Sequence, residues 1–172
     1  MEFISNLVTN SRAWFLLTIS ALGLEITALY FQYVLGLAPC IMCIYQRTAL
    51  WGIFAAGIVG MLGNKSMPLR LLSYILWGIS SVWGLLIAIE HVDIQTSEFS
   101  FMYVCEIVPN FPQWAPLHEW LPLLFEATGD CGEINWQFFN FTMPQMMIVV
   151  FGIYSAILAV TLLIRIFTNK TI

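Results

Sequence analysis

The chain carries the stretch LAPCIMCIYQR at residues 37–47, between two strongly apolar segments. Two cysteines, Cys40 and Cys43, stand three positions apart in it, and Arg47 follows four positions after the second. A Cys-x-x-Cys pair is typical of redox or metal chemistry, and its surroundings decide between them. An arginine is rare in so apolar a region. The segments on either side therefore decide both the fold and the use of this pair.

The composition is that of a membrane protein. Of the 172 residues, 60% are hydrophobic and only 9% are charged, whereas soluble domains are about half apolar and a quarter charged. Four apolar segments are long enough to cross a bilayer core of about 30 Å. They are residues 13–35, 43–63, 71–89 and 145–164. The first is too long for the apolar part of a cleaved signal peptide, so we interpret it as a spanning helix.

The sequence predicts an all-α membrane protein, a four-transmembrane-helix bundle that forms a single membrane domain over residues 1–172. Pro39 ends the first helix, because proline disfavours helix in the residue before it. In the second segment Gly52, Ala56 and Gly60 recur every four residues. Such a ridge of small side chains lets a neighbouring helix approach closely.

The basic residues predict the orientation of the bundle. An even number of spans places both termini and the turn at residues 64–70 on one side. That side holds five of the six basic residues, namely Arg12, Lys65, Arg70, Arg165 and Lys170, so the positive-inside rule makes it cytoplasmic. Loops 36–42 and 90–144, with all four cysteines, then face the periplasm, where disulfides persist. We expect a multi-pass protein of the bacterial inner membrane.

The long loop over residues 90–144 has a pattern of its own. Apolar side chains recur at helical spacing after Pro116, at Leu117, Trp120, Leu121 and Leu124. Together with tryptophans suited to the headgroup region, at Trp114, Trp120 and Trp136, they predict a short helix over about residues 113–125 on the membrane surface. A small folded cap outside the membrane is the alternative.

The cysteines allow more than one chemistry. Cys105 and Cys131 stand in the acidic long loop, so two static disulfides are one interpretation. A four-cysteine zinc site would need two tight pairs, and only Cys40 and Cys43 form one, so we expect no metal. A pair at the membrane surface beside a positive charge favours thiol–disulfide exchange, because the attacking species is the thiolate. Arg47, one helical turn from Cys43, supplies that charge.

Three further polar residues are candidates for function. Glu25 is the carboxylate deep within a span, and its sequence position fits a functional acid and a helix–helix hydrogen bond equally well. His91 ends the third apolar segment, and Gln95 follows one turn later if the helix continues. A lone histidine at an interface is by itself more often a solvated cap than a site.

In their order and spacing these residues resemble the bacterial disulfide bond formation protein B (DsbB) family over nearly the whole chain. The motifs are Pro39-Cys-x-x-Cys43-x-Tyr-x-Arg47, Glu90-His91 with Gln95, Phe111-Pro112-x-Trp114, Gly129-Asp130-Cys131 and Met143-Pro144-Gln145. The resemblance implies a protein-dithiol:quinone oxidoreductase. Such an enzyme reoxidises a periplasmic thioredoxin-fold, DsbA-like dithiol oxidase and passes the electrons to a membrane quinone, either ubiquinone or menaquinone.

The resemblance also implies a role for each cysteine. Cys105–Cys131 would be the disulfide that the partner attacks, with Cys105 forming the mixed disulfide. Cys131, released as a thiolate, would attack Cys40 and bridge the two loops. Cys43 would then be the thiolate that meets the quinone.

Three other residues take roles from the same resemblance. Arg47 would stabilise the Cys43 thiolate and the reduced quinone oxygen, and His91 and Gln95 would border the quinone site. Gln46 departs from the glutamate of the best-known member, which puts the tuning of that site in question. The implied partners are the DsbA-like protein, the quinone pool and membrane lipid, with neither nucleic acid nor metal.

Two other function classes compete with this hypothesis. The first is a structural or assembly protein whose cysteines form static disulfides, which would resist a reduced partner. The second is a small transporter that uses Glu25 as a proton relay, but four spans without a repeat disfavour it.

Overall fold

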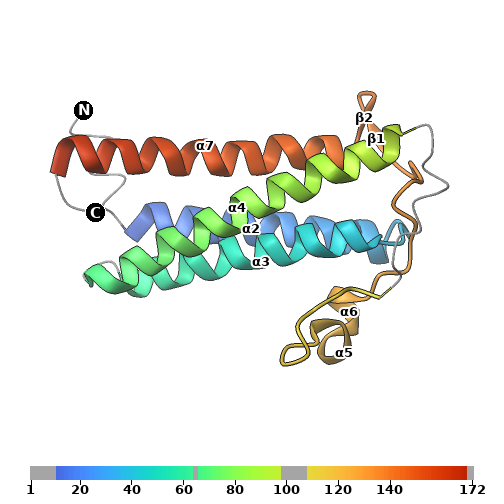
Figure 1. Ribbon diagram of the computed structural model, residues 1–172, viewed down its shortest axis with the longest axis horizontal. Helices are drawn as coiled ribbons and strands as arrows, with labels where there is room; N and C mark the ends of the chain where they lie inside the picture. Colours follow the sequence, from blue (N-terminus) through green and yellow to red (C-terminus); the bar gives the residue numbers. More distant parts are fainter. Residues whose placement is uncertain (1–10, 64–65, 98–107, 170–172) are drawn as a thin grey trace.

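The computed structural model describes residues 11–63, 66–97 and 108–169 (Figure 1). Four long helices make up most of it, namely α2 (Ser11–Tyr33), α3 (Ile41–Leu62), α4 (Met67–Thr96) and α7 (Met143–Asn169). Each is long and apolar enough to cross a membrane. The predicted four-transmembrane-helix fold is therefore confirmed.

Helix α4 extends beyond the apolar segment 71–89 that predicted it. The helix continues through His91 to Thr96, and the backbone N–H of Ser97 closes it on the Asp93 carbonyl at 3.0 Å. Apolar content marks the part of a helix that lies in the bilayer core, whereas backbone hydrogen bonding can carry the helix further into the interface. The extension puts His91 and Gln95 four residues apart on one helix face.

Helix α3 packs closely against both α2 and α4, and α4 also packs against α7 (Figure 1). A Cβ atom at Gly52 would overlap the Ser80 side chain of α4, and one at Gly60 would overlap the Trp14 ring of α2. Ala56, between them, has no exposed surface. The predicted ridge of small residues is thus used by neighbours on both sides of α3.

The helix ends divide the bundle into two ends (Figure 1). The start of α2, the end of α3, the start of α4 and the end of α7 lie at one end. The start of α3, the end of α4 and the start of α7 lie at the other end. The segment over residues 108–142, called the connection below, lies next to them and leads into α7. This up-and-down arrangement is the one that the even number of spans predicts.

The connection before α7 contains two one-turn helices and a small hairpin. The helices are α5 (Leu117–Trp120) and α6 (Pro122–Phe125), so the predicted helix over residues 113–125 is split. The split lies at Leu121, where φ −135° and ψ 64° precede proline. Strands β1 (Gln137–Phe138) and β2 (Phe141–Thr142) are antiparallel and too short for any sequence pattern to predict. Their two-residue turn has positive φ at both positions, as hairpins of this kind require.

Candidate redox site

Helix α3 begins with the cysteine pair. Cys40 is its N-cap residue, and its Sγ accepts a hydrogen bond from the backbone N–H of Cys43 at 3.4 Å. The two sulfur atoms lie 2.9 Å apart, with Cys40 buried and Cys43 half-buried. The free N–H groups of a first helical turn favour negative charge nearby. The fold therefore places Cys43, in the first turn of α3, where the helix N-terminus favours a thiolate.

The long connection brings a third cysteine to the same place. The backbone N–H groups of Thr128 and Gly129 both donate to the Pro39 carbonyl, at 2.9 and 3.0 Å. A Cβ at Gly129 would overlap the carbonyl oxygen of Ala38, so this approach needs glycine. Two residues later, Cys131 is fully buried, and its side chain hydrogen-bonds Cys40. The structure thus brings together three of the four predicted redox cysteines.

Hydrogen bonding controls the protonation of Cys40. The side chains of Cys131 and Cys43, together with burial, raise the pKa of the Cys40 thiol above its ordinary value. In the reduced state, the neutral thiol is therefore favoured at Cys40, and a negative charge is favoured on Cys43 or Cys131 instead. Cys105, the remaining predicted cysteine, lies outside the described residues, and its pairing with Cys131 stays a prediction.

His91 of α4 contacts both the cysteine pair and Gln46 of α3. Its Nε2 lies 3.5 Å from Cys40 Sγ, and its Nδ1 lies 3.4 Å from Gln46 Nε2. All three side chains are buried. One ring nitrogen of His91 thus faces the Cys40 sulfur and the other faces the side-chain amide of Gln46. Gln46 was noted in the sequence only as a departure from the family, and its contact with His91 depends on packing between helices.

The guanidinium group of Arg47 makes three polar contacts. Its Nη1 donates to Gln32 Oε1 of α2 at 2.9 Å and to the Leu124 carbonyl of α6 at 2.7 Å. Its Nε lies 3.6 Å from Glu25 Oε2, and both side chains are buried. Glu25 therefore forms an ion pair with the arginine, although its carboxylate oxygens accept no hydrogen bond from the described residues. The guanidinium ties α2, α3 and the connection together, one turn below Cys43.

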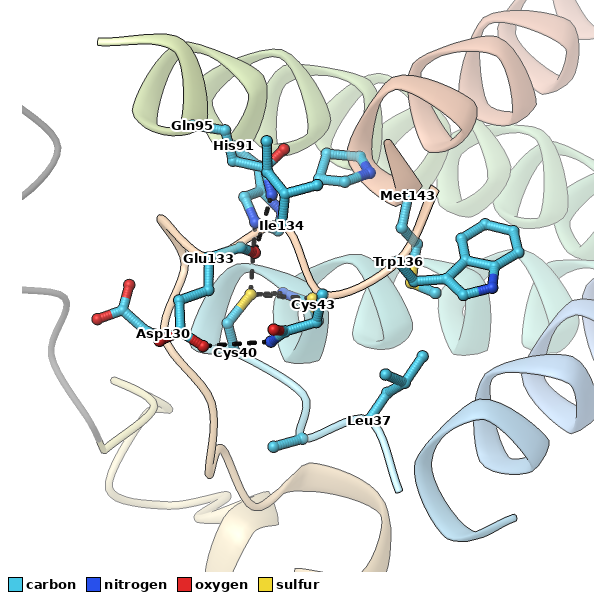
Figure 2. A pocket seen from close by; sticks show the side chains of 13 residues that line it. Leu37, Cys40, Cys43, His91, Gln95, Asp130, Glu133, Ile134, Trp136 and Met143 are labelled. Carbon is cyan, nitrogen blue, oxygen red and sulfur yellow. Dashed lines mark hydrogen bonds between the residues drawn. The ribbon is translucent and has the colours of Figure 1, made fainter. Parts of the chain in front are cut away.

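A cavity of about 60 Å³ opens beside the sulfurs (Figure 2). It is lined by residues from the ends of α3, α4 and α7 and from the connection: Leu37, Ala38, Cys40, Cys43, His91, Gln95, Asp130, Glu133, Ile134, Asn135, Trp136, Met143 and Pro144. Gln95 Nε2 donates to the Glu133 carbonyl at 3.5 Å, and Gln95 Oε1 is buried without a hydrogen-bond partner among the described residues. A volume of this size has room for several water molecules.

The candidate residues thus meet at one end of the bundle. Cys40, Cys43, His91 and Gln95 line the cavity, whereas Arg47 is not among the lining residues and lies one turn after Cys43 on α3. The sequence did not single out Gln32 as a partner of Arg47. A glutamine inside an apolar span was the available signal, since a buried amide needs hydrogen-bond partners.

Comparison with known proteins agrees with this geometry. The family model described as Disulfide bond formation protein DsbB matches residues 10–161. A disulfide bond formation protein B from Pseudoalteromonas atlantica is 56% identical over 172 residues, covering all of both chains, and one from Pseudoalteromonas translucida is 48% identical over the same length. One from Psychromonas ingrahamii is 52% identical over 83% of this chain and 77% of that protein. This multi-pass membrane chain belongs to the DsbB family of disulfide bond formation proteins.

Proposed function

We propose that the protein reoxidises a periplasmic thioredoxin-fold, DsbA-like dithiol oxidase and passes the two electrons to a membrane quinone. The observation that carries the proposal is the meeting of Cys131 with Cys40 and Cys43 at one end of the bundle. A soluble partner can reach a cysteine on a loop, whereas a quinone stays at membrane level. A relay between two cysteine pairs joins these two locations.

The relay conserves electrons at every step. A partner thiolate attacks Cys105 of the Cys105–Cys131 disulfide, and the partner's second thiolate then resolves the mixed disulfide. The Cys131 thiolate attacks Cys40 Sγ, breaks the Cys40–Cys43 bond and leaves Cys43 as the thiolate. Cys105 then attacks Cys131, which re-forms the Cys105–Cys131 disulfide and releases Cys40, so that Cys40 and Cys43 are both reduced. Oxidation of this pair to its disulfide would pass two electrons and two protons, taken from the partner's dithiol, to a quinone, which would become a hydroquinone.

Charge and protonation favour Cys43 as the residue that carries the negative charge. The raised pKa of Cys40 keeps that sulfur protonated when both are reduced. Arg47 brings a buried positive charge one turn below Cys43 on the same face of α3. A charge so held needs no reorganisation when a thiolate forms.

The residues beside the cavity fit a quinone head group. Gln95 has a buried Oε1 without a hydrogen-bond partner among the described residues, and His91 lines the same space. Arg47, His91 and Gln95 would hold the quinone oxygens, and the quinone would supply a two-electron acceptor. His91 also faces Cys40, where its ring can give or take the proton as that sulfur changes partner.

The orientation in the membrane follows from charge. Arg12, Arg70 and Arg165 stand at the end of the bundle opposite the cysteines. That end is cytoplasmic under the positive-inside rule. The cysteine end then faces the periplasm, and the exposed Trp114 and Trp120 fit the predicted contact of the connection with the membrane surface.

The test uses purified protein, a reduced thioredoxin-fold partner and a water-soluble quinone. Cys105→Ser should stop oxidation of the protein partner, and Cys43→Ser should stop quinone reduction. His118→Asn, far from the cysteine pair in sequence and outside the cavity, is the control and should leave both rates unchanged. Disulfides that resist the reduced partner would favour the static structural protein. Quinone reduction that survives Cys43→Ser would overturn the assigned order.

A further inference from the structure

We propose that the reduced protein binds a thiophilic divalent cation, with Zn²⁺ as the best fit, through Cys40 Sγ, Cys43 Sγ and His91 Nε2. The site is separate from the proposed relay in chemistry, because binding moves no electrons. It uses residues of the relay, however, so a bound cation would block exchange. That consequence rests on the proposed function, whereas binding itself does not.

The three donor atoms are close enough together to share one metal ion. All lie within 4.8 Å of one another. Zinc bonds of about 2.3 Å to sulfur and about 2.0 Å to nitrogen separate two sulfur ligands by about 3.8 Å and a sulfur from a nitrogen by about 3.5 Å. Cys40 Sγ and His91 Nε2 already lie 3.5 Å apart. The two sulfurs, at 2.9 Å, need to separate further, and a small side-chain rotation of the half-buried Cys43 provides this.

Charge balance suits a buried cation at this position. Zn²⁺ with two thiolates and a neutral imidazole has no net charge, and the two thiol protons pass to solvent on binding. A neutral complex avoids much of the cost of burying an ion. The nearby positive charge of Arg47 is offset by Glu25, which lies 3.6 Å from it. The site is therefore not repelled by an isolated buried cation.

The surroundings supply the remaining requirements of a zinc site. A zinc-bound histidine donates its other ring N–H to an acceptor, which fixes its orientation. His91 Nδ1 faces the side-chain amide of Gln46, and rotation of that amide presents Oε1 as the acceptor. The cavity of about 60 Å³ beside the donors leaves room for water as a fourth ligand.

Binding in this geometry depends on the redox state. A Cys40–Cys43 disulfide removes both thiolates, and a bond between Cys131 and Cys40 removes one of them. Only the fully reduced pair provides the complete donor set. Zn²⁺ would therefore bind when electrons accumulate on the protein, and its release would restore exchange.

The test measures metal binding directly, without partner or quinone. The full-length Cys105→Ser/Cys131→Ser protein in detergent, reduced with a metal-free phosphine, is titrated with Co²⁺ and then with Zn²⁺. We expect one equivalent of Co²⁺ with the absorption of a tetrahedral thiolate complex, displaced by Zn²⁺. Cys40→Ser or Cys43→Ser should abolish the spectrum, and His91→Asn should weaken binding at least about tenfold. His118→Asn is the matched control and should bind normally.

Oxidation of the same unsubstituted pair provides a control without a folding defect. The oxidised protein should bind no Co²⁺, and reduction should restore binding. Failure of the reduced protein to take up either metal at micromolar concentration would overturn the proposal, as would equal binding after oxidation. Neither result bears on the proposed relay, because its rates are measured separately, in buffer with a chelator and with all four cysteines present.

Discussion

Arg47 and Glu25 form a buried ion pair between helices α3 and α2, with Nε and Oε2 3.6 Å apart. The pair sits one turn below Cys43, and the same guanidinium holds the Leu124 carbonyl of the connection. Glu25, whose sequence position fits two roles, therefore balances the charge of Arg47 near the cysteine pair. Its effect on the cysteines acts through the position and charge of Arg47.

Glu25→Gln should destabilise the protein by about 3 kcal/mol, because removal of one partner leaves the other charge buried and uncompensated. Thermal unfolding in detergent measures the loss. Glu119→Gln makes the same change on an exposed side chain of α5 and should alter stability by less than about 0.5 kcal/mol. Arg47→Met combined with Glu25→Gln should recover part of the loss, since neither charge then remains. Strict additivity of the two single variants would contradict the ion pair.

Arg47→Met should raise the quinone KM by about 10- to 100-fold, which corresponds to the loss of one charge-assisted interaction. Arg47→Lys should give an intermediate KM, because an ammonium keeps the charge but cannot serve all three partners of the guanidinium. Arg12→Met removes an exposed arginine at the opposite end of the bundle and should leave the KM unchanged. An unchanged quinone KM in Arg47→Met would separate this arginine from the quinone site.

The sequence predicts what depends on neighbouring residues and on total apolar length. Four long apolar segments predict the four helices, since few other structures satisfy backbone hydrogen bonds in a membrane. The spacing of Cys43 and Arg47 also predicts that they share one helix face. These relationships are local, so the packing of the bundle does not alter them.

Contacts between distant segments follow from packing alone. Gln46 and His91 are 45 residues apart in sequence and meet because α3 and α4 pack closely. Glu25 likewise signals a partner without identifying Arg47, because any polar group on a neighbouring helix would satisfy a buried acid. The position of Cys131 beside Cys40 was implied by family resemblance and not by spacing. It depends on backbone hydrogen bonds to Pro39.

Gly129→Ala should slow the formation of a bond between Cys131 and Cys40. The added methyl group overlaps the Ala38 carbonyl, so the connection must move away from the start of α3. We expect at least a tenfold slower rate, because a displacement that raises the activation free energy by about 1.4 kcal/mol has that effect. Acid quenching and thiol labelling after mixing with reduced partner would measure it. Gly152→Ala, where a Cβ meets nothing within 4 Å, is the matched control. Equal rates in both variants would mean that the connection does not need this close approach.

The reactivity of Cys40 should show an unusual pH dependence in the reduced protein. Its pKa is raised, chiefly by the hydrogen bond to Cys131, so the thiolate forms only above the ordinary thiol range of about 8.5. The rate of Cys40 alkylation, followed by peptide mass spectrometry in a Cys105→Ser background, should therefore still be rising at pH values where an ordinary thiol has reached its plateau. Cys131→Ala removes the largest cause and should shift the midpoint of the profile to lower pH. The midpoint distinguishes this effect from burial, because poor access lowers the rate at every pH without moving the midpoint. A midpoint in the ordinary range, unaffected by Cys131→Ala, would mean that Cys131 does not hold the Cys40 proton.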